Sequence, residues 1–482
     1  MPRHADADRT SRARAAATSL ADAQALIRAG RPGDAIPSLE RMTAATPGDA
    51  GAWIALGVAH SMVGEHARAV EAAARGVVLA PRIALVHLAH GDVLRMAGQL
   101  GAARNAYAAA VDLAPDNADA LNKLAGSERI DRDFDAARAH LLRALAHLPA
   151  HPYAQVNLAT LAVEEGALDE ARRRLTDVLR LSHLPRDAAD EASATLAMLD
   201  EHVALAPVVA RAGADGDPAP LEDALRARGE PARRDERWVA IFDALIARTA
   251  GEAPIDGIFP RGRPTSACWS AIEAHHNFRG LGGATALATT IERIASNADE
   301  VETREIRDYA SVVARSESGP FAFADGAAWE AWLRFTHAGL VASRPAYWPG
   351  QLKPVNNLLP SDPQRSRPEP LAVAGTLRTV MTRIDAELPP GAWRACLRYC
   401  AIIEIHPFRD GNGRLARYVL NRTLEDAGLF PSLRPDNDEL GLARSIQLAR
   451  RHGDLRGIAE QAAKGAHYAA DLDRRWAERS AR

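Results

Sequence analysis

Apolar and polar positions in the first part of the chain recur with a fixed period of 34 residues. One glycine series keeps the same period through Gly30, Gly64, Gly98 and Gly166, with Arg132 at the place where the series is interrupted. A period of this length indicates an array of similar helical units rather than one ordinary globular core. The prolines that mark it are Pro47, Pro81, Pro115 and Pro149.

Small residues stand in register between these markers, where two helices that cross closely leave no space for a larger side chain. They are Ala35, Ala69, Ala103, Ala137 and Ala171, and the most complete unit adds Trp53, Leu56 and Gly57. This pattern resembles the tetratricopeptide repeat, a helix–turn–helix unit with the same period. The resemblance implies about five units over residues 16–184.

Stacked units of this kind form a curved solenoid with a concave groove, which predicts a bound peptide or partner helix. A rigid spacer and a homodimer contact remain alternatives, because repeats do not disclose their ligands. We expect a disordered segment at 1–15, the solenoid at 16–212, and a helical connector at 213–260 that begins with the joint GADGDPAP.

A second domain is expected at 261–465, with its core at about 325–430 and a tail at 466–482. Within it, Trp393, Leu397, Cys400 and Ile403 follow the helical period until Pro407 and a glycine-rich turn interrupt it. A new helical pattern follows, with Asn412 at the expected N-cap position. Together with the low aromatic fraction of 5%, these patterns predict a predominantly α fold.

The turn between these two helices carries the chemistry. Arg414 and Arg417 lie on one face of the first helical turns, where the helix dipole disfavours cations unless an anion docks there. The backbone N–H groups of Gly411–Gly413 fit that anion, and a polyphosphate matches the whole arrangement. Asp410 is suited to Mg²⁺, which prefers oxygen ligands. His406 can take the proton of an attacking hydroxyl, and Phe408 is expected to point inward as an anchor.

The stretch HPFRDGNGRLAR resembles, position for position, the signature H-P-F-x-(D/E)-G-N-G-R-x-x-R of the Fic family. The resemblance implies an α-helical Fic fold with a small β-hairpin flap, and transfer of AMP from Mg·ATP to a Ser, Thr or Tyr hydroxyl of a target protein. It makes His406 the general base and Asp410 the metal ligand. The amides of Gly411–Gly413 and the Asn412 side chain would hold the α-phosphate, and Arg414 and Arg417 the outer phosphates.

Two further features follow from that resemblance. The flap candidate is AYWPGQLKPVNNLLP, in which Gly350 and Lys353 would position the target, with a plain proline-rich loop as the alternative. Glu273, in WSAIEAHHN, is the candidate for an inhibitory glutamate that pairs with Arg417, and it could also orient a water molecule that removes AMP again. The alternative is an ordinary exposed helix glutamate.

Composition narrows the remaining possibilities. The formal net charge of −3 gives no long-range attraction for nucleic acid or an anionic membrane. Neither a signal peptide nor an apolar run of spanning length is readable, so a soluble bacterial protein of the cytoplasm is expected. Three cysteines, Cys268, Cys396 and Cys400, favour neither disulfides nor zinc. Transfer of phosphocholine or phosphate, and a non-catalytic repeat adaptor that only binds nucleotide, remain the competing functions.

Overall fold

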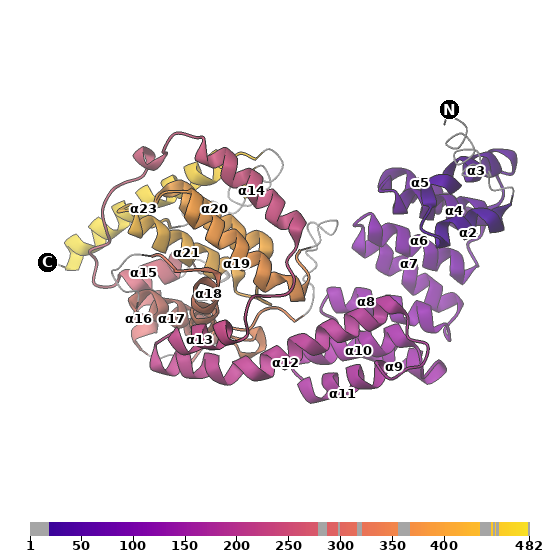
Figure 1. Ribbon diagram of the computed structural model, residues 1–482, viewed down its shortest axis with the longest axis horizontal. Coiled ribbons are helices and arrows are strands. Elements are labelled where there is room, and N and C mark those ends of the chain that lie inside the picture. The colour runs from indigo at the N-terminus through magenta and orange to yellow at the C-terminus, as the bar shows by residue number, and fades with distance from the viewer. Residues whose placement is uncertain are drawn as a thin grey trace, which may run out of the picture. The chain divides into compact units, whose positions relative to one another are not determined.

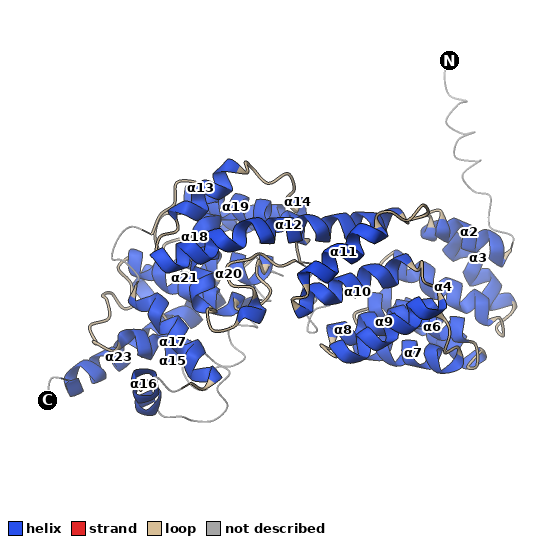
Figure 2. Cartoon of the chain, turned by 90° about the horizontal axis from the view of Figure 1, so that it is seen from below, coloured by secondary structure: helices blue, strands red, loops and turns tan. Residues whose placement is uncertain are grey.

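The computed structural model describes residues 19–277, 287–296, 299–315, 321–354, 367–433, 445–446, 449 and 453–480. These residues fold into α-helices joined by short turns, with two isolated β-bridges and no strand among them (Figure 2). The predominantly helical prediction is therefore confirmed. The predicted disordered segment, 1–15, lies outside the described residues.

The first part of the chain consists of consecutive antiparallel helix pairs (Figure 1). Each pair is joined by a tight turn, and each packs on the next pair along the chain. The helices are α2 Leu20–Arg28, α3 Pro32–Ala45, α4 Ala50–Met62, α5 His66–Leu79, α6 Ala84–Met96, α7 Leu100–Leu113, α8 Ala118–Ile130, α9 Phe134–His147, α10 Pro152–Glu165 and α11 Leu168–Val178.

The predicted register of this array is confirmed residue by residue. The five in-register alanines, Ala35, Ala69, Ala103, Ala137 and Ala171, are all buried to 1% exposure or less. A Cβ added to Gly57 would lie only 3.0 Å from the Ala69 carbonyl and from Ala73, so this helix crossing requires glycine. Arg132, which interrupts the glycine series, adopts the same left-handed backbone as the glycines, with φ of 63°.

The remaining helices form the second part. They are α12 Arg186–Asp215, α13 Ala219–Ala227, α14 Glu236–Ala250, α15 Trp269–Asn277, α16 Leu287–Ala295, α17 Val301–Ala314, α18 Gly326–Leu340, α19 Pro370–Glu387, α20 Ala392–Ile405, α21 Asn412–Asp426 and α23 Arg456–Ser480, with short 3₁₀ turns at Asp256–Ile258 and Pro345–Tyr347. One continuous hydrophobic core joins most of them, and α20 and α21 lie at its centre.

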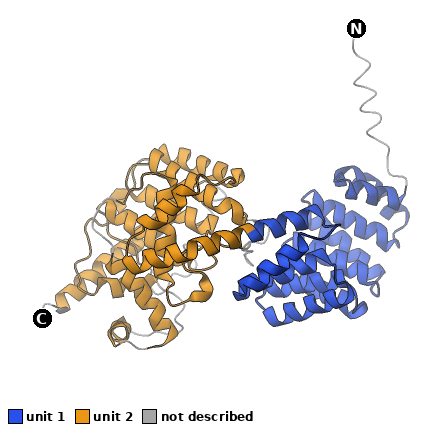
Figure 3. Ribbon diagram, turned by 60° about the horizontal axis from the view of Figure 1, so that its bottom comes forward, with its two compact units in different colours: residues 1–196, 358–366 blue, residues 197–357, 367–482 orange. Residues whose placement is uncertain are grey.

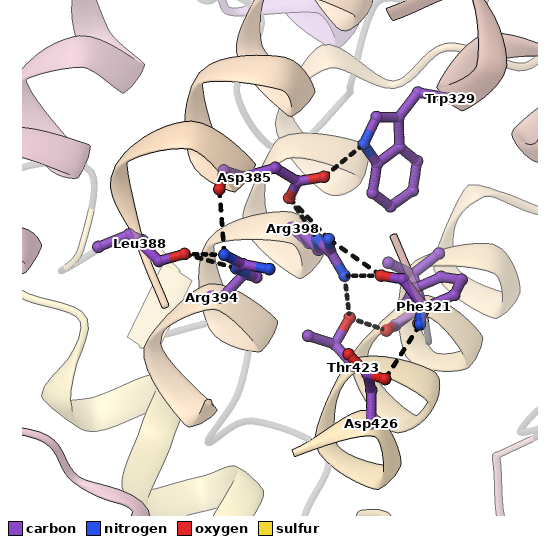
Figure 4. Close-up of polar contacts among 9 residues, drawn as sticks. Phe321, Trp329, Asp385, Leu388, Arg394, Arg398, Thr423 and Asp426 are labelled. Carbon is purple, nitrogen blue, oxygen red and sulfur yellow. Dashed lines mark hydrogen bonds and ion pairs between the residues drawn. The ribbon is translucent and has the colours of Figure 1, made fainter. Parts of the chain in front are cut away.

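A buried polar cluster fixes α19, α20 and α21 against one another (Figure 4). Arg398 of α20 is fully buried, and its guanidinium donates to Asp385 of α19 at 2.6 Å and to the Thr423 hydroxyl of α21 at 3.0 Å. The second oxygen of Asp385 accepts from the Trp329 indole at 2.7 Å. Arg398 and Asp385 are paired with each other, as buried charges normally are, and the bond from Arg398 to Thr423 joins α20 to α21, the two helices that flank the predicted site.

The chain divides into two compact units, and the division falls between Leu196 and Ala197, inside α12 (Figure 3). The sequence had placed the joint at 213, and α12 in fact continues to Asp215. The sequence predicts no membrane-spanning segment. α12, however, is long and apolar enough to cross a membrane by length and composition. In the second unit, however, Leu205, Val209 and Ala212 of this helix are buried against Leu221, Leu225 and Ala331, as in a core helix of a folded domain.

The flap segment contains no hairpin over its described residues, 346–354. It begins within a 3₁₀ turn and ends beside the predicted site, where Leu352 forms an isolated antiparallel bridge with Phe408 and the Lys353 N–H donates to the Pro407 carbonyl at 2.8 Å. Residues 355–360 of the predicted hairpin lie outside the described residues.

Candidate active site

The loop between α20 and α21 is held by its own side chains. The N–H of Phe408 donates to Asn412 Oδ1 at 2.9 Å, and Asn412 Nδ2 donates to the Phe408 carbonyl at 2.8 Å. Phe408 is fully buried, so the prediction that it points inward is confirmed. The Asn412 side-chain amide therefore stabilises the loop through two hydrogen bonds to the Phe408 backbone. In this conformation neither Oδ1 nor Nδ2 of Asn412 is available to a phosphate.

The N-cap of α21 is Gly411 rather than Asn412, because the Asn412 side chain is committed to Phe408. Gly411 has φ of 78°, and a Cβ there would lie 2.8 Å from Val341 Cγ1 and 3.1 Å from His337 Nε2. Glycine is thus required both by the backbone conformation and by the lack of space. The N–H groups of Asn412, Gly413 and Arg414 open the helix and have no carbonyl partner within it, as an anion site requires.

His406 follows the last residue of α20 and is itself in the left-handed region, with φ of 53°. Its Nδ1 lies 3.4 Å from the Ile403 carbonyl; since a carbonyl only accepts, this contact assigns the proton to Nδ1 and leaves Nε2 as an acceptor. Burial, reinforced by the positive charges of Arg367 and Lys353, lowers the pKa of His406 to about 3. The imidazole is therefore neutral at physiological pH, with Nε2 as its unprotonated nitrogen.

His337 of α18 packs against the loop between α20 and α21. The sequence analysis did not identify this residue. It is fully buried, its ring stacks on Phe408 at 3.9 Å between centroids, and Nε2–H donates to the Asp410 carbonyl at 2.8 Å. Its Nδ1 accepts from the Gly350 N–H at 3.0 Å. Burial lowers the pKa of His337 to about 3, so the ring stays neutral and joins the two loops. The sequence feature that could have identified His337 is its position on the apolar face of a helix, between Leu333 and Leu340.

The two signature arginines have different surroundings. Arg414 is buried, and its guanidinium donates to the Leu340 carbonyl at 3.2 Å and lies 3.4 Å from Glu305 Oε1. Glu305, on α17, also pairs with Arg344 at 3.0 Å. Arg417 is partly exposed, and its Nη1 lies 3.3 Å from where a Gly413 Cβ would stand, over the first turn of α21. Arg417 is therefore the arginine that lies over the predicted phosphate site.

Asp410 is exposed at the mouth of the loop. One of its carboxylate oxygens accepts from the Gly411 N–H at 2.6 Å, so an anionic group already contacts one of the predicted anion-binding amides. No group of three or more His, Cys, Asp or Glu side chains in the described ranges is arranged to hold a metal ion. A single exposed carboxylate nevertheless fits Mg²⁺, which typically takes one or two protein carboxylates and completes its shell with phosphate and water oxygens.

Glu273 of α15 is buried, and three groups bind its carboxylate. Asn421 of α21 donates at 2.8 Å, the Trp269 indole at 3.0 Å and the Tyr309 hydroxyl at 3.5 Å. Arg417, the predicted partner, is not among these groups. The alternative of an exposed glutamate is wrong, since Glu273 is 2% exposed. Burial, with Glu425 nearby, raises the pKa of Glu273 to about 7.

Both predicted domains of the chain match known family models. Residues 20–82 and 88–154 match a tetratricopeptide-repeat family model, and 129–186 match a second one. Residues 330–424, which contain His337 and the whole signature loop, match the model of the Fic/DOC family. The chain carries a Fic/DOC domain behind tetratricopeptide repeats. The match to the Fic domain lies inside the predicted core at 325–430.

Curated relatives share only parts of this chain. The protein adenylyltransferases fic-1 of Caenorhabditis briggsae and Caenorhabditis elegans are each 35% identical over 81 residues, which is 17% of this chain and 15% of theirs. The protein O-mannosyl-transferase TMTC1 of Mus musculus is 34% identical over 123 residues, 25% of this chain and 13% of that protein. The chain thus spans about one seventh of the length of these relatives.

Solved structures with local similarity include MamA, with 22% identity, a TM-score of 0.30, and coverage of 33% of this chain and 92% of MamA. TTC0263, a tetratricopeptide-repeat protein from Thermus thermophilus, is 22% identical with a TM-score of 0.33, over 36% of this chain and 95% of its own.

Proposed function

We propose that this protein is an adenylyltransferase that moves AMP from Mg·ATP to a Ser, Thr or Tyr hydroxyl of a target protein. One observation carries the proposal: the neutral His406 stands on the same short loop as the open N-terminus of α21. A proton acceptor and an anion site in one loop are what transfer of a phosphoryl-linked group to a hydroxyl needs. The partial likeness to two proteins named adenylyltransferases supports AMP as the group transferred.

The reaction follows from these positions. His406 Nε2 takes the proton of the target hydroxyl as its oxygen bonds to the α-phosphorus, and the bond from that phosphorus to the bridging oxygen of pyrophosphate breaks. The first N–H groups of α21 bind the negative charge on the α-phosphate, and Arg417 binds the outer phosphates. Bound Mg²⁺, held by Asp410, would neutralise part of the triphosphate charge. Positioning and charge stabilisation account for most of the rate.

The test is labelling of protein by ATP radioactive at the α-phosphate, in the presence of Mg²⁺ and a cell lysate as the source of targets. We expect label on protein, its loss in His406→Ala, and its retention in His183→Ala, which replaces an exposed histidine of the repeat unit. ATP labelled at the γ-phosphate should give no protein label. Label from the γ-phosphate alone would indicate phosphate transfer, and no label from either position would favour an adaptor.

We also propose that Glu273 inhibits the transfer reaction, but through a contact other than the predicted pair with Arg417. Asn421, which binds the carboxylate, lies four residues after Arg417 and hence one turn further along the same face of α21. Glu273 therefore acts on the helix that carries Arg417 rather than on Arg417 itself. Glu273→Gly should raise labelling if this contact restrains α21, and unchanged labelling would reject the inhibitory role.

We propose that the array of repeats binds a protein or peptide in its concave groove and thereby selects the target protein. Replacing the repeats by those of an unrelated protein should change which lysate proteins are labelled without changing the affinity for ATP.

A further inference from the structure

Lys353 is the most unusual charged residue of the second unit. Its side chain is fully buried, and its Nζ has no hydrogen-bond partner anywhere in the described part of the chain. A buried ammonium without an acceptor is costly, and such groups are normally paired or bound to a ligand. The sequence assigned Lys353 to target positioning on a flap, which does not explain why a charge is buried there.

The position of Lys353 ties it to the reacting end of the loop. Its backbone N–H donates to the Pro407 carbonyl at 2.8 Å, one residue after His406, and the preceding residue forms the bridge to Phe408. Arg367 is the charged residue that acts on Lys353, and it is itself bound: it donates to Glu404 Oε2 at 2.9 Å and to the Glu404 carbonyl. The positive charge of Lys353 acts on His406 and helps to lower the pKa of that imidazole, so the ammonium and the imidazole lie close to each other.

We propose that Lys353 binds a nonbridging oxygen of the phosphoryl group that is transferred, and that its ammonium is the counter-charge of the reacting group. This inference rests on the proposed function. The side chain has a flexible four-carbon stem, so the ammonium can extend toward an anion that arrives at His406. Arg367 cannot take this role without breaking its pair with Glu404.

The electrostatics of Lys353 favour an anionic ligand. Burial, together with the positive charge of Arg367, lowers the pKa of Lys353 to about 7. An ammonium lacking an anionic partner shifts in this direction, and an oxygen anion within contact distance shifts it back. An anion beside His406 would also relieve the repulsion between Lys353 and a protonated imidazole.

The test compares binding of AMP and adenosine to the full chain by calorimetry, because these two probes differ only in the phosphate. In Lys353→Met the affinity for AMP should fall about tenfold or more while that for adenosine is unchanged, the loss expected for one charged hydrogen bond. Lys353→Arg should restore the preference for AMP. Lys464→Met, which removes an exposed lysine, is the matched control, and Lys353→Gln replaces the methionine variant if that protein does not fold.

With a labelled target, kcat should fall about 100-fold in Lys353→Met, as for the loss of one donor to a developing oxyanion. An unchanged ratio of AMP to adenosine affinity in the folded variant overturns the inference. Reduced labelling with that ratio unchanged assigns the ammonium to an acidic group of the target and overturns it too. If the unaltered chain binds neither AMP nor ATP, the proposed function itself fails.

Discussion

Arg414 and Arg417 lie three residues apart, yet the folded chain uses them differently. Arg414 is enclosed by Glu305, the Leu340 carbonyl and the ring of Tyr347, 5.7 Å from its guanidinium carbon. Removal of Arg414 takes away one of the two arginines that neutralise the buried Glu305 carboxylate, and Arg344 is the other; the loss of a buried ionic partner destabilises the fold. Arg414 is thus held by three groups of the protein, whereas Arg417 is partly exposed beside the first turn of α21.

We therefore expect Arg414→Ala to lower the melting temperature of the Fic domain strongly. Arg417→Ala should lower the melting temperature less, because Arg417 is partly exposed, and it should weaken ATP binding. Thermal unfolding and calorimetric titration with ATP measure the two effects on the same samples. Equal destabilisation by both substitutions would contradict this division of roles.

Glu273 gives the Fic domain a pH-dependent stability. Its pKa of about 7 in the folded chain lies above the ordinary value near 4.3 for an unfolded chain. Between these values the folded state binds more protons than the unfolded state, so stability is fully present below the lower value and falls as the pH rises toward the upper one. Glu273→Gln should flatten this fall, as measured by urea unfolding at pH 5 and pH 7.5.

Glu302→Gln, which alters an exposed carboxylate at the start of α17, is the control and should retain the slope of the unaltered chain. A slope that persists in Glu273→Gln would assign the pH dependence to other groups.

At the scale of elements, the turn into α21 depends on Gly411. Gly428, which follows the end of the same helix, has a similar φ of 70° and no atom within 4 Å of an added Cβ. Both alanine substitutions incur the backbone cost of about 1–2 kcal/mol for a left-handed residue. Only Gly411→Ala adds the overlap with Val341 and His337.

We expect Gly411→Ala to destabilise the Fic domain clearly more than Gly428→Ala, and to abolish protein labelling where Gly428→Ala retains it. Chemical denaturation of the two variants compares their free energies of unfolding. Similar values for both would mean that the loop relaxes around the added methyl group.

Sequence patterns predicted the repeats well because every repeat is built by the same local constraints: a helix crossing lined by small residues and a turn with one residue in the left-handed conformation. They placed His406 and the glycine turn on one loop for the same local reason. They did not identify Asn421 as a partner of Glu273 or Glu305 as a partner of Arg414, because these contacts join α15 and α17 to residues of α21 that lie more than 100 positions away. The N-cap also differed, since the bond between Asn412 and Phe408 competes with capping.

At the scale of the whole molecule, α12 is shared between the two units, and its residues 197–215 belong to the unit that contains the Fic domain. Leu205, Val209 and Ala212 are each 5% exposed or less, and they pack on α13 and α18. The joint predicted at 213 would separate them from that core. Each buried aliphatic side chain of leucine or valine size contributes about 1.5–3 kcal/mol, so the boundary at 197 or at 213 matters for the stability of an isolated Fic unit.

We expect a fragment of residues 197–482 to unfold cooperatively and at a clearly higher temperature than a fragment of residues 213–482, which lacks those three side chains. Leu205→Ala with Val209→Ala in the longer fragment should reproduce most of the difference, because it removes the same apolar contacts while keeping the chain length. The exposed Val203 of the same helix, replaced by alanine, is the control. Calorimetry of the four proteins measures their melting temperatures. Equal melting temperatures for both fragments would mean that α12 does not stabilise the Fic domain and that the joint lies at 213.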